Sequence, residues 1–518
     1  MFMTINFISL KKTMAMLLFM TSLSCSSSNE SVEETPYLTV KSVSSISLSA
    51  SGGETVISVS SWPKAVAQSN TEWLTLKSAT QLDKLTSFVF VSKANEGSAR
   101  ESIITITAGE KKETITISQA KSNQPENKPI DENQPAVKVA KGLGLGWNLG
   151  NQLDAYVNDV ADEVSWGNGK ATQETFHKVK NAGFTSVRIP ITWLGKVGVA
   201  PHYKIDLAWL DRAQELVNYA ENAGLKVIIN IHHDGYRHIN EDGSVKRNWL
   251  DIVKASDDAA ANNAIKAQFE AMWRQIAERF KDKGEFLIFE GLNEIHDGKW
   301  GMGTNTTDGG KQYAILNEWQ QVFVDAVRAT GGNNATRYLG ISGYCTNPDL
   351  TMKFLKLPND PAKDRLLVSV HYYDPATFAL EDKFSEWGHT GAVGSKEAWG
   401  DEAHLEQLFA ALRTTYVEKG IPVYIGEMGC VHRSNARSEL FRKYYLEYVC
   451  KAARTNGMAV FYWDNGSAGS GRECSGVINH ASGAYLNNGK DVVNVMTKGY
   501  FSEDASYTLE TVYNNAPQ

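Results

Sequence analysis

The chain has 518 residues, of which 42% are hydrophobic and 21% are charged, and its formal net charge at pH 7 is -7. This length is enough for two or three domains. So small a net charge leaves no basic footprint for nucleic acid and no field that would attract a polyanionic substrate. We therefore expect no nucleic-acid partner.

The N-terminus has the features of an export signal. Lys11 and Lys12 precede an apolar run at 14–20, which is too short to span a bilayer, and small residues follow up to Cys25. The segment Ser22-Leu23-Ser24-Cys25 resembles a bacterial lipobox, with Leu23 one position late. The resemblance implies that 1–25 is a lipoprotein signal peptide and that Cys25 carries the lipid. The protein would then be exported and held at the cell surface or outer membrane by that anchor only. A plain secretory signal is the alternative.

Residues 37–120 have the pattern of a small all-β domain. Short runs at 55–59, 88–91, 104–107 and 114–118 alternate apolar and polar residues, with Ser, Gly and Asn between them. This alternation predicts a β-sandwich. The stretch resembles a BACON domain through Glu72-Trp73-Leu74, the turn at 95–100 and the closing ITISQA at 115–120. The name of that family implies carbohydrate binding, but a spacer role is equally consistent with the pattern.

A linker is predicted at 121–136. This stretch contains Pro125, Pro129 and Pro135 among polar residues and no aromatic residue. Such a composition is typical of a semi-rigid connection between domains. The catalytic domain is then expected over 137–518.

From residue 137 onward, apolar runs alternate with amphipathic helical patterns. One such helix places five apolar residues on a single face: Leu207, Leu210, Ala213, Val217 and Ala220. The strand candidates are 142–149, 186–191, 226–233, 286–294, 337–343, 366–373, 422–429 and 458–464. Eight such units predict an α/β fold, a (β/α)8 TIM barrel. An open doubly wound sheet is the alternative, but no helix directly follows the glycines of GLGLGWNLG as a dinucleotide site would require.

Active sites of such barrels lie at the carboxyl ends of the strands. In this chain those ends carry a dense polar set on otherwise apolar strands: Asn148, Asn151, Arg188, His232, His233, Asn293, Glu294, His371, Tyr373, Glu427 and Trp463. We expect these residues to lie together at the mouth of the barrel.

Two of them, Glu294 and Glu427, close the apolar runs LIFEGLNE and PVYIGE. Hydrolysis of a glycosidic bond needs such a pair, one carboxylic acid to protonate the leaving oxygen and one carboxylate to attack, about 5 Å apart in retaining enzymes. A structural ion pair with Arg188 is the alternative for either glutamate. We expect Arg188 and Tyr373 to hold Glu427 ionised and Asn293 to bind a sugar 2-hydroxyl.

The histidines do not favour a metal site. His371 and Tyr373 are two residues apart and share a face of one strand. His232 and His233 are adjacent, so a regular strand would turn one to the site and the other against the barrel wall. The chain also has no HExxH helix, so we expect no metal.

In order, these residues resemble glycoside hydrolase family 5: Arg188, His232-His233, Asn293-Glu294, His371-Tyr372-Tyr373, Glu427 and Trp463. GWNLGNQLDA at 146–155 and WGN at 166–168 are similar to the endoglucanase branch of that family, and HYYDP at 371–375 to its subfamily 4. The resemblance covers about 137–501. It implies a retaining enzyme with Glu294 as acid/base, Glu427 as nucleophile and no cofactor. The remaining candidates would bind substrate: Asn151, Arg188, His232, His233, Asn293, His371, Tyr373 and Trp463.

The expected substrate is a β-glucan polysaccharide, cut within a β-1,4-linked backbone such as xyloglucan, mixed-linkage glucan or soluble cellulose derivatives. Six tryptophans at or after strand ends could stack on sugar rings, although half or more of them could only pack loops: Trp147, Trp166, Trp193, Trp249, Trp300 and Trp387. A β-mannanase and a non-catalytic surface glycan-binding lipoprotein are the alternatives. We expect a monomer. The pairing of Cys345, Cys430, Cys450 and Cys474 stays open.

Overall fold

The computed structural model describes residues 35–41, 45–48, 52–95, 98–119, 129–235, 237–239, 245–301 and 310–518. The chain divides into two compact units, Met1–Ser122 and Asn123–Gln518. The predicted signal peptide and Cys25 lie outside the described residues. Within the described part, no helix combines the length and the apolar character needed to cross a bilayer.

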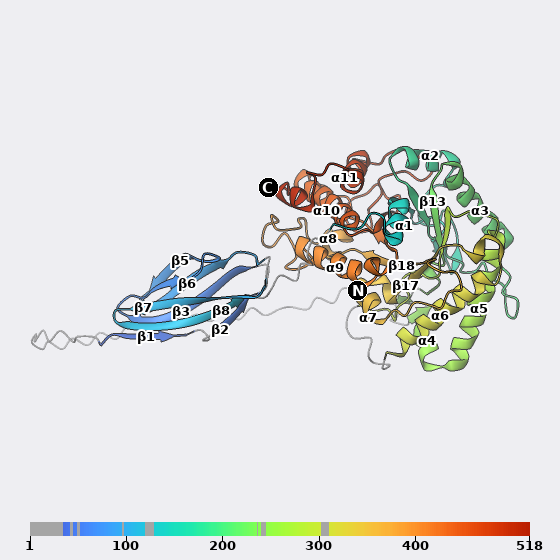
Figure 1. Cartoon of the computed structure of the whole chain (residues 1–518). Coiled ribbons are helices and arrows are strands. Elements are labelled where there is room, and N and C mark those ends of the chain that lie inside the picture. Colours follow the sequence, from blue (N-terminus) through green and yellow to red (C-terminus); the bar gives the residue numbers. More distant parts are fainter. Residues whose placement is uncertain are drawn as a thin grey trace, which may run out of the picture. The chain divides into compact units, whose positions relative to one another are not determined.

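The N-terminal unit is a sandwich of two four-stranded sheets (Figure 1). In spatial order, the first sheet contains β1 (Tyr37–Val40), β3 (Gly53–Trp62), β6 (Leu85–Ser92) and β5 (Leu74–Leu82). The second contains β2 (Ser45–Leu48), β8 (Lys111–Gln119), β7 (Arg100–Ala108) and β4 (Val66–Ser69). Alternate residues such as Ile57, Phe88 and Ile104 are buried between the sheets. The predicted β-sandwich is confirmed.

The second unit is a closed barrel of eight parallel strands (Figure 1). Around the barrel the strands are β9 (Leu145–Leu149), β12 (Ser186–Ile189), β13 (Lys226–Asn230), β16 (Leu287–Glu290), β17 (Leu339–Ser342), β18 (Leu366–Tyr372), β19 (Val423–Met428) and β20 (Ala459–Asp464). The predicted (β/α)8 fold is confirmed.

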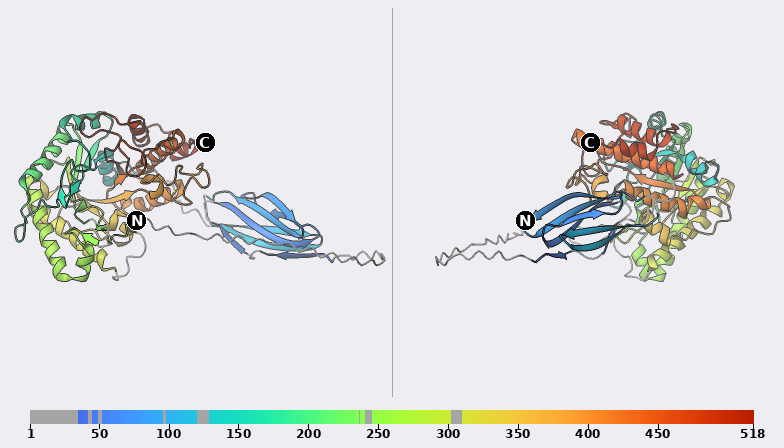
Figure 2. Two further views of the ribbon diagram at one scale, coloured as in Figure 1. Left: turned by 180° about the vertical axis from the view of Figure 1, so that it is seen from behind. Right: turned by 60° about the vertical axis from the view of Figure 1, so that its left-hand side comes forward.

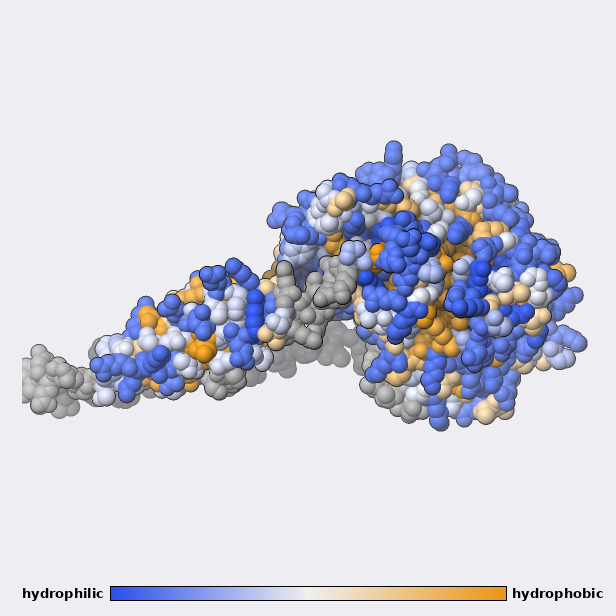
Figure 3. Space-filling view, in the orientation of Figure 1, coloured by the Kyte–Doolittle hydropathy of each residue, from blue (hydrophilic) through white to orange (hydrophobic). Residues whose placement is uncertain are grey.

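Helices surround the strands (Figure 2). The longer ones are α2 (Gln173–Asn181), α3 (Leu207–Asn222), α5 (Ala259–Arg279), α6 (Lys311–Arg328), α9 (Glu402–Thr415), α10 (Ala436–Thr455) and α11 (Gly489–Phe501). In α3 the periodic residues from Leu210 onward are buried, whereas Leu207 at its first turn is exposed. Hydrophilic side chains cover most of the face of this unit seen in Figure 3, and apolar ones show mainly in hollows between them.

Short elements complete this unit. They are two hairpins, β10 (Tyr156–Val157) with β11 (Val160–Ala161) and β14 (Arg237–Ile239) with β15 (Val245–Arg247), the helices α4 (Ile252–Asp257), α7 (Pro348–Phe354), α8 (Ala376–Ala379) and α12 (Leu509–Asn514), and the 3-10 turns η1 (His233–Gly235), η2 (Gly332–Ala335), η3 (Tyr344–Thr346) and η4 (Val417–Lys419).

The interior of the barrel is layered. At its amino-terminal end, apolar residues of the strands pack against Ala140 and Leu143 of α1 (Pro135–Leu143): Ile228, Ile288, Leu367, Tyr424, Ala459 and Phe461. Because side chains alternate along a strand, the residues two positions further on also face inward. On three strands these are polar and fully or almost fully buried: Asn230, Glu290 and Ser369. The buried Arg188 of β12 joins them through its hydrogen bonds to Glu290. A polar layer therefore lies directly on an apolar floor.

The predicted linker extends too far. Ile130 packs against the barrel core, a Glu132 carboxylate oxygen lies 2.7 Å from Arg454 Nη2, and the Gln134 side chain donates to the Val417 carbonyl at 2.6 Å. Pro135, taken from the sequence as a linker residue, is at the start of α1, where its missing N–H costs no helical hydrogen bond. Residues 130–136 thus belong with the barrel unit.

This boundary can be tested with two truncated chains that begin at Pro129 and at Val137. The shorter chain loses the partly buried Ile130, the Gln134 hydrogen bond and the first residues of α1, which together stabilise by about 2–4 kcal/mol. Scanning calorimetry should therefore show it melting several degrees lower than the longer chain. Equal melting temperatures would mean that 129–136 contribute nothing to the barrel.

Candidate active site

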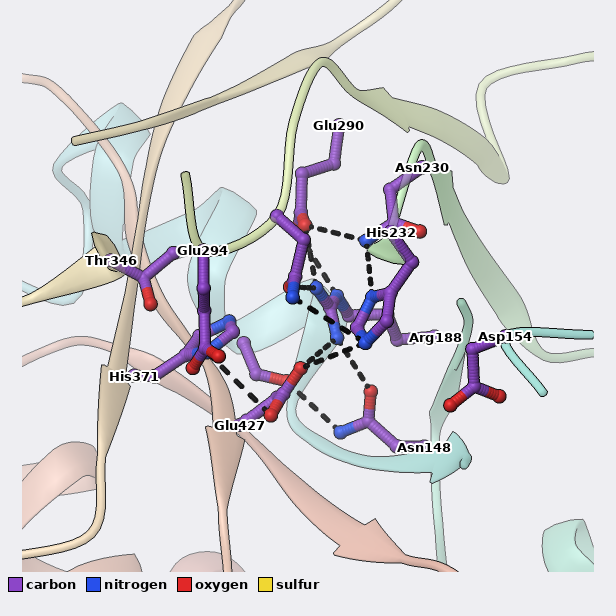
Figure 4. A network of polar contacts seen from close by, with 12 residues as sticks. Asn148, Asp154, Arg188, Asn230, His232, Glu290, Glu294, Thr346, His371 and Glu427 are labelled. Atoms are coloured by element: carbon purple, nitrogen blue, oxygen red, sulfur yellow. Dashed lines mark hydrogen bonds and ion pairs between the residues drawn. The ribbon is translucent and has the colours of Figure 1, made fainter. Parts of the chain in front are cut away.

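Arg188 of β12 is the centre of the polar layer (Figure 4). Its Nε and Nη2 donate to Glu290 at 3.2 and 2.7 Å. Its Nη1 donates to Glu427 Oε1 at 2.7 Å and to Asn148 Oδ1 at 3.1 Å, and its Nη2 also reaches Asn293 Oδ1 at 2.7 Å. The guanidinium is fully buried and its donors all have acceptors, so it fixes the side chains of four neighbouring segments.

Glu427 of β19 is the carboxylate held by this cation. Besides the Arg188 contact, its Oε2 accepts the Tyr373 hydroxyl at 3.1 Å. Both contacts were predicted from the sequence and are confirmed. Burial raises the pKa of Glu427, while the charge of Arg188 and its hydrogen bond oppose this rise. These donors favour the ionised form of Glu427 over that of its neighbour Glu294.

Glu294 lies in the loop after β16 rather than on the strand, which ends at Glu290. Its Oε1 lies 2.8 Å from His371 Nδ1. Burial raises the pKa of Glu294 to about 7, with Arg188 opposing the rise and the charge of Glu290 adding to it. The His371 ring is itself kept neutral, because burial lowers its pKa to about 4. Glu294 therefore retains a proton close to neutral pH.

The two carboxyl groups face one another. One oxygen of Glu294, one of Glu427 and a ring nitrogen of His371 all lie within 4.8 Å of one another. The groups differ in their partners, since only Glu427 accepts from a guanidinium and a phenol. A protonated and an ionised carboxyl at this separation form the pair that acid-assisted nucleophilic displacement requires.

A β-bulge turns Glu427 into the barrel. Val370 pairs with Ile425, but His371 pairs with Glu427, so Gly426 is the extra residue. Without the shift, alternation from the inward-facing Tyr424 would point Glu427 outward; bulges commonly re-aim side chains in this way. A Cβ at Gly426 would lie 3.0 Å from Ser369 Oγ and 3.1 Å from His371 Nε2. Glycine therefore leaves room for the crowded interior.

The prediction for the adjacent histidines is wrong. β13 ends at Asn230 and His233 begins η1, so strand alternation does not apply and the two rings lie 4.4 Å apart. His232 is parallel to the Trp463 ring at 5.7 Å, and its Nε2 is 3.9 Å from Glu427 Oε1. His233 lies 5.5 Å from the Trp166 ring instead of against the barrel wall. Both histidines are at the carboxyl end of the barrel.

The hydrogen bonds that Asn151 makes in the structure involve its backbone N–H and carbonyl groups. Asn151 has a positive φ of 55°, its N–H donates to Asp154 Oδ2 at 3.0 Å, and its carbonyl accepts from the Asn168 side chain at 2.9 Å. Asn168 also donates to the Asn465 carbonyl at 2.9 Å. Through Asn168, the WGN segment therefore links the loop after β9 to the loop after β20 by hydrogen bonds.

Four of the six candidate tryptophan platforms are structural. Trp147, Trp193 and Trp387 are at most 2% exposed, and the Trp147 indole donates to Asp464 at 2.9 Å. Trp249 packs against the core and donates to Asp234 at 2.7 Å. Trp166 and Trp300 are 40% and 47% exposed, so these two remain available for stacking. Trp399, in the loop after β18, is 50% exposed and was missed.

Two further residues of the site, Glu290 and Asn230, are not among the candidates predicted from the sequence. Glu290 accepts from Arg188, from the Tyr424 hydroxyl at 2.6 Å and from Asn230 at 3.0 Å. The available signal was a charged residue inside the apolar run LIFEGLNE, because a carboxylate buried in a barrel needs a cationic partner.

Two groups in the described part have ligand atoms near enough together for a cation: Glu294, His371 and Glu427, and Asp154, His232 and His233. Hydrogen bonds account for both groups. In the first, Glu294 bonds to His371 and Glu427 accepts from Arg188. In the second, the Asp154 oxygens accept the backbone N–H groups of Asn151 and Gln152. The four cysteines of the described part are free thiols.

Two segments match known families. Residues 152–469 match the family described as cellulase (glycosyl hydrolase family 5). Residues 61–120 match the BACON family, described as a putative binding domain, N-terminal. The first match includes both Glu294 and Glu427.

Individual proteins show the same likeness. Endoglucanase A of Paenibacillus barcinonensis is 37% identical over 349 residues, which is 64% of this chain and 83% of that protein. A GH5-4 broad specificity endoglucanase from Bacteroides salanitronis has a TM-score of 0.68 and 57% identity, covering 72% of this chain and 97% of that chain. A Bacteroides ovatus GH5 xyloglucanase in complex with a XXXG heptasaccharide has a TM-score of 0.61 and 28% identity, covering 89% and 99%. The barrel, the glutamate pair and these relatives agree, and the chain belongs to glycoside hydrolase family 5.

Proposed function

We propose that the protein is a retaining, endo-acting hydrolase of β-1,4-glucan backbones. The observation that carries this proposal is the pair of unlike carboxyl groups, Glu294 and Glu427, with oxygens within 4.8 Å. Retaining glycosidases place their two carboxyl groups about 5–5.5 Å apart, whereas inverting enzymes leave room for a water between them.

In the first step, a Glu427 oxygen attacks the anomeric carbon as the glycosidic bond breaks. Glu294 gives its proton to the departing oxygen, so the leaving chain ends in a neutral hydroxyl. In the second step, the ionised Glu294 takes a proton from water, whose oxygen attacks the same carbon and releases Glu427. Arg188 and Tyr373, which hold Glu427 before the attack, orient the attacking oxygen, and His232, Asn293 and Trp463 line the sugar site.

The choice of substrate is supported by the relatives and by the exposed aromatic residues. The relatives include an endoglucanase, a broad specificity endoglucanase and a xyloglucanase. Trp166 and Trp300 lie on the loops after β9 and β16 with exposed rings, and aromatic rings of this kind stack on the C–H faces of sugars. We infer that soluble xyloglucan and mixed-linkage glucan are cut in preference to crystalline cellulose.

We also propose that the enzyme is exported and held at the outer membrane by a lipid on Cys25. Replacement by alanine removes the acylated thiol, so Cys25→Ala should move the protein into the soluble fraction, detected by cell fractionation. A wild-type protein that is already soluble and begins downstream of Cys25 would contradict the anchor.

The roles of the two glutamates can be separated chemically. Glu427→Ala removes the nucleophile and should lower kcat by several orders of magnitude, and added azide should restore turnover with an inverted product. Glu294→Ala should retain activity on aryl glycosides with good leaving groups, because these need no proton. Proton NMR of the wild-type reaction provides the check, and an inverted first product would overturn the double displacement.

Substrate choice can be tested by product analysis on tamarind xyloglucan, barley β-glucan, carboxymethylcellulose and glucomannan. We expect a rapid fall in viscosity and oligosaccharide products from the first two, because exposed platforms bind a chain along its length. Release of only mono- or disaccharides would exclude endo-action. Cleavage confined to mannan would make the enzyme a β-mannanase, and no cleavage of any polymer would favour a glycan-binding role.

A further inference from the structure

Glu290 is fully buried and lies on the other side of Arg188 from Glu427 (Figure 4). Its carboxylate meets side chains from four other strands. Arg188 of β12 binds both oxygens, and Tyr424 of β19 donates to Oε2 at 2.6 Å. Asn230 of β13 donates to Oε1 at 3.0 Å and Ser369 of β18 to Oε2 at 3.4 Å. A carboxylate with so many donors is held in one position.

We propose that Glu290 is a positioning residue for the reaction. It anchors Arg188 below Glu427 and, through Asn230, fixes the ring of His232 with its Nε2–H toward the sugar site. This inference rests on the proposed roles of Glu294 and Glu427.

Glu290 balances the charge of Arg188. Arg188 lies between two carboxylates, Glu290 at 2.7 Å on one side and Glu427 at 2.7 Å on the other. Burial alone would raise the pKa of Glu290, but the charge and hydrogen bonds of Arg188 outweigh it and the pKa is lowered. Glu290 therefore stays ionised and neutralises Arg188. Without that charge, Arg188 would act on Glu427 alone and make it a more stable, less nucleophilic carboxylate.

Asn230 sets the tautomer of His232. Asn230 Oδ1 accepts the Ile191 N–H at 3.1 Å, so the Asn230 amide group must be the donor to Glu290 and to His232 Nδ1, which is 3.1 Å away. The Asn293 amide nitrogen lies 3.4 Å from His232 Nε2, because Asn293 Oδ1 accepts from Arg188. The contact at Nδ1 is the shorter of the two, and an Nδ1 that accepts a hydrogen bond leaves the ring proton on Nε2. That N–H points to the side of the ring where Glu427 Oε1 lies, 3.9 Å away.

The barrel leaves space for this arrangement. A Cβ at Gly340 of β17 would lie 2.3 Å from the Tyr424 hydroxyl oxygen. Any larger residue at Gly340 would displace the phenol from Glu290. The packing around Glu290 therefore involves five of the eight barrel strands besides its own.

The charge part can be tested with Glu290→Gln in the full chain. Loss of the negative charge lets Arg188 stabilise both ionised glutamates more strongly, so both limbs of the pH profile of kcat/KM should move to lower pH by about one unit. For Glu294 and Glu427 these limbs also depend on the charged and titratable groups around them: Asp154, Arg188, His232, Cys345, His371, Tyr373 and Glu473. Because all of these are unchanged in the variant, a shift reports Glu290. We expect kcat to fall at least about tenfold with a smaller change in KM, since the nucleophile is misplaced after substrate has bound.

Tyr424→Phe is the matched control. It removes one hydrogen bond from the same carboxylate but no charge, so both limbs should stay where they are in the wild type. Thermal melting establishes that each variant is folded. A folded Glu290→Gln protein with unmoved limbs would overturn the charge part.

The tautomer part has a readout that does not depend on catalysis. Ring ¹⁵N chemical shifts of histidine-labelled protein, assigned with a His232→Gln variant, should show His232 with its proton on Nε2. Asn230→Ala keeps every charge and should shift the ring toward a mixture of tautomers. A wild-type His232 with its proton on Nδ1 would overturn the proposal even if Glu290→Gln does not fold. Failure of azide to restore turnover in Glu427→Ala would instead overturn the proposed function, but it would not change the tautomer measured for His232.

Discussion

The ion pair between Arg188 and its two carboxylates is the interaction on which the site depends. A guanidinium buried in a barrel is costly unless its charge is balanced and its donors are used. Glu290 and Glu427 supply that balance from opposite sides, and Asn148 and Asn293 accept the remaining bonds. The nucleophile Glu427 therefore shares its cation, Arg188, with Glu290 in the barrel interior.

The same burial separates the properties of the two reacting glutamates. Desolvation favours the neutral form of both. Burial raises the pKa of both groups, but Arg188 and Tyr373 donate to Glu427 and favour its ionised form, while Glu294, with His371 as its close partner, keeps a proton to about pH 7. The β-bulge at Gly426 is what places Glu427 near enough to receive both donors. The division of roles therefore follows from backbone register as much as from residue type.

Periodicity and strand order predicted much of this structure. Alternation predicted the sandwich, and the polar residues at strand ends predicted the Arg188–Glu427 and Tyr373–Glu427 contacts. The errors came from features without a local signature. The orientation of His232 and His233 depends on where β13 ends, and burial of Trp147, Trp193 and Trp387 depends on how loops fold over the barrel. Glu290 was missed because the expected strand ran on to Glu294, whereas β16 ends at Glu290, so this residue was not counted among the strand-end residues.

The position of the polar layer links the stability of the barrel to its chemistry. Strands β13, β16 and β18 each contribute an apolar residue to the floor and, two residues on, a member of the network, while Gly340 of β17 leaves room for the Tyr424 hydroxyl. A substitution in this layer acts on folding, through an unpaired buried charge, and on the reaction, through the position of Glu427. Loops at the mouth are not constrained in this way. We therefore infer that substrate range varies through exposed residues such as Trp166, Trp300 and Trp399, while the layer beneath them changes little without loss of both fold and activity.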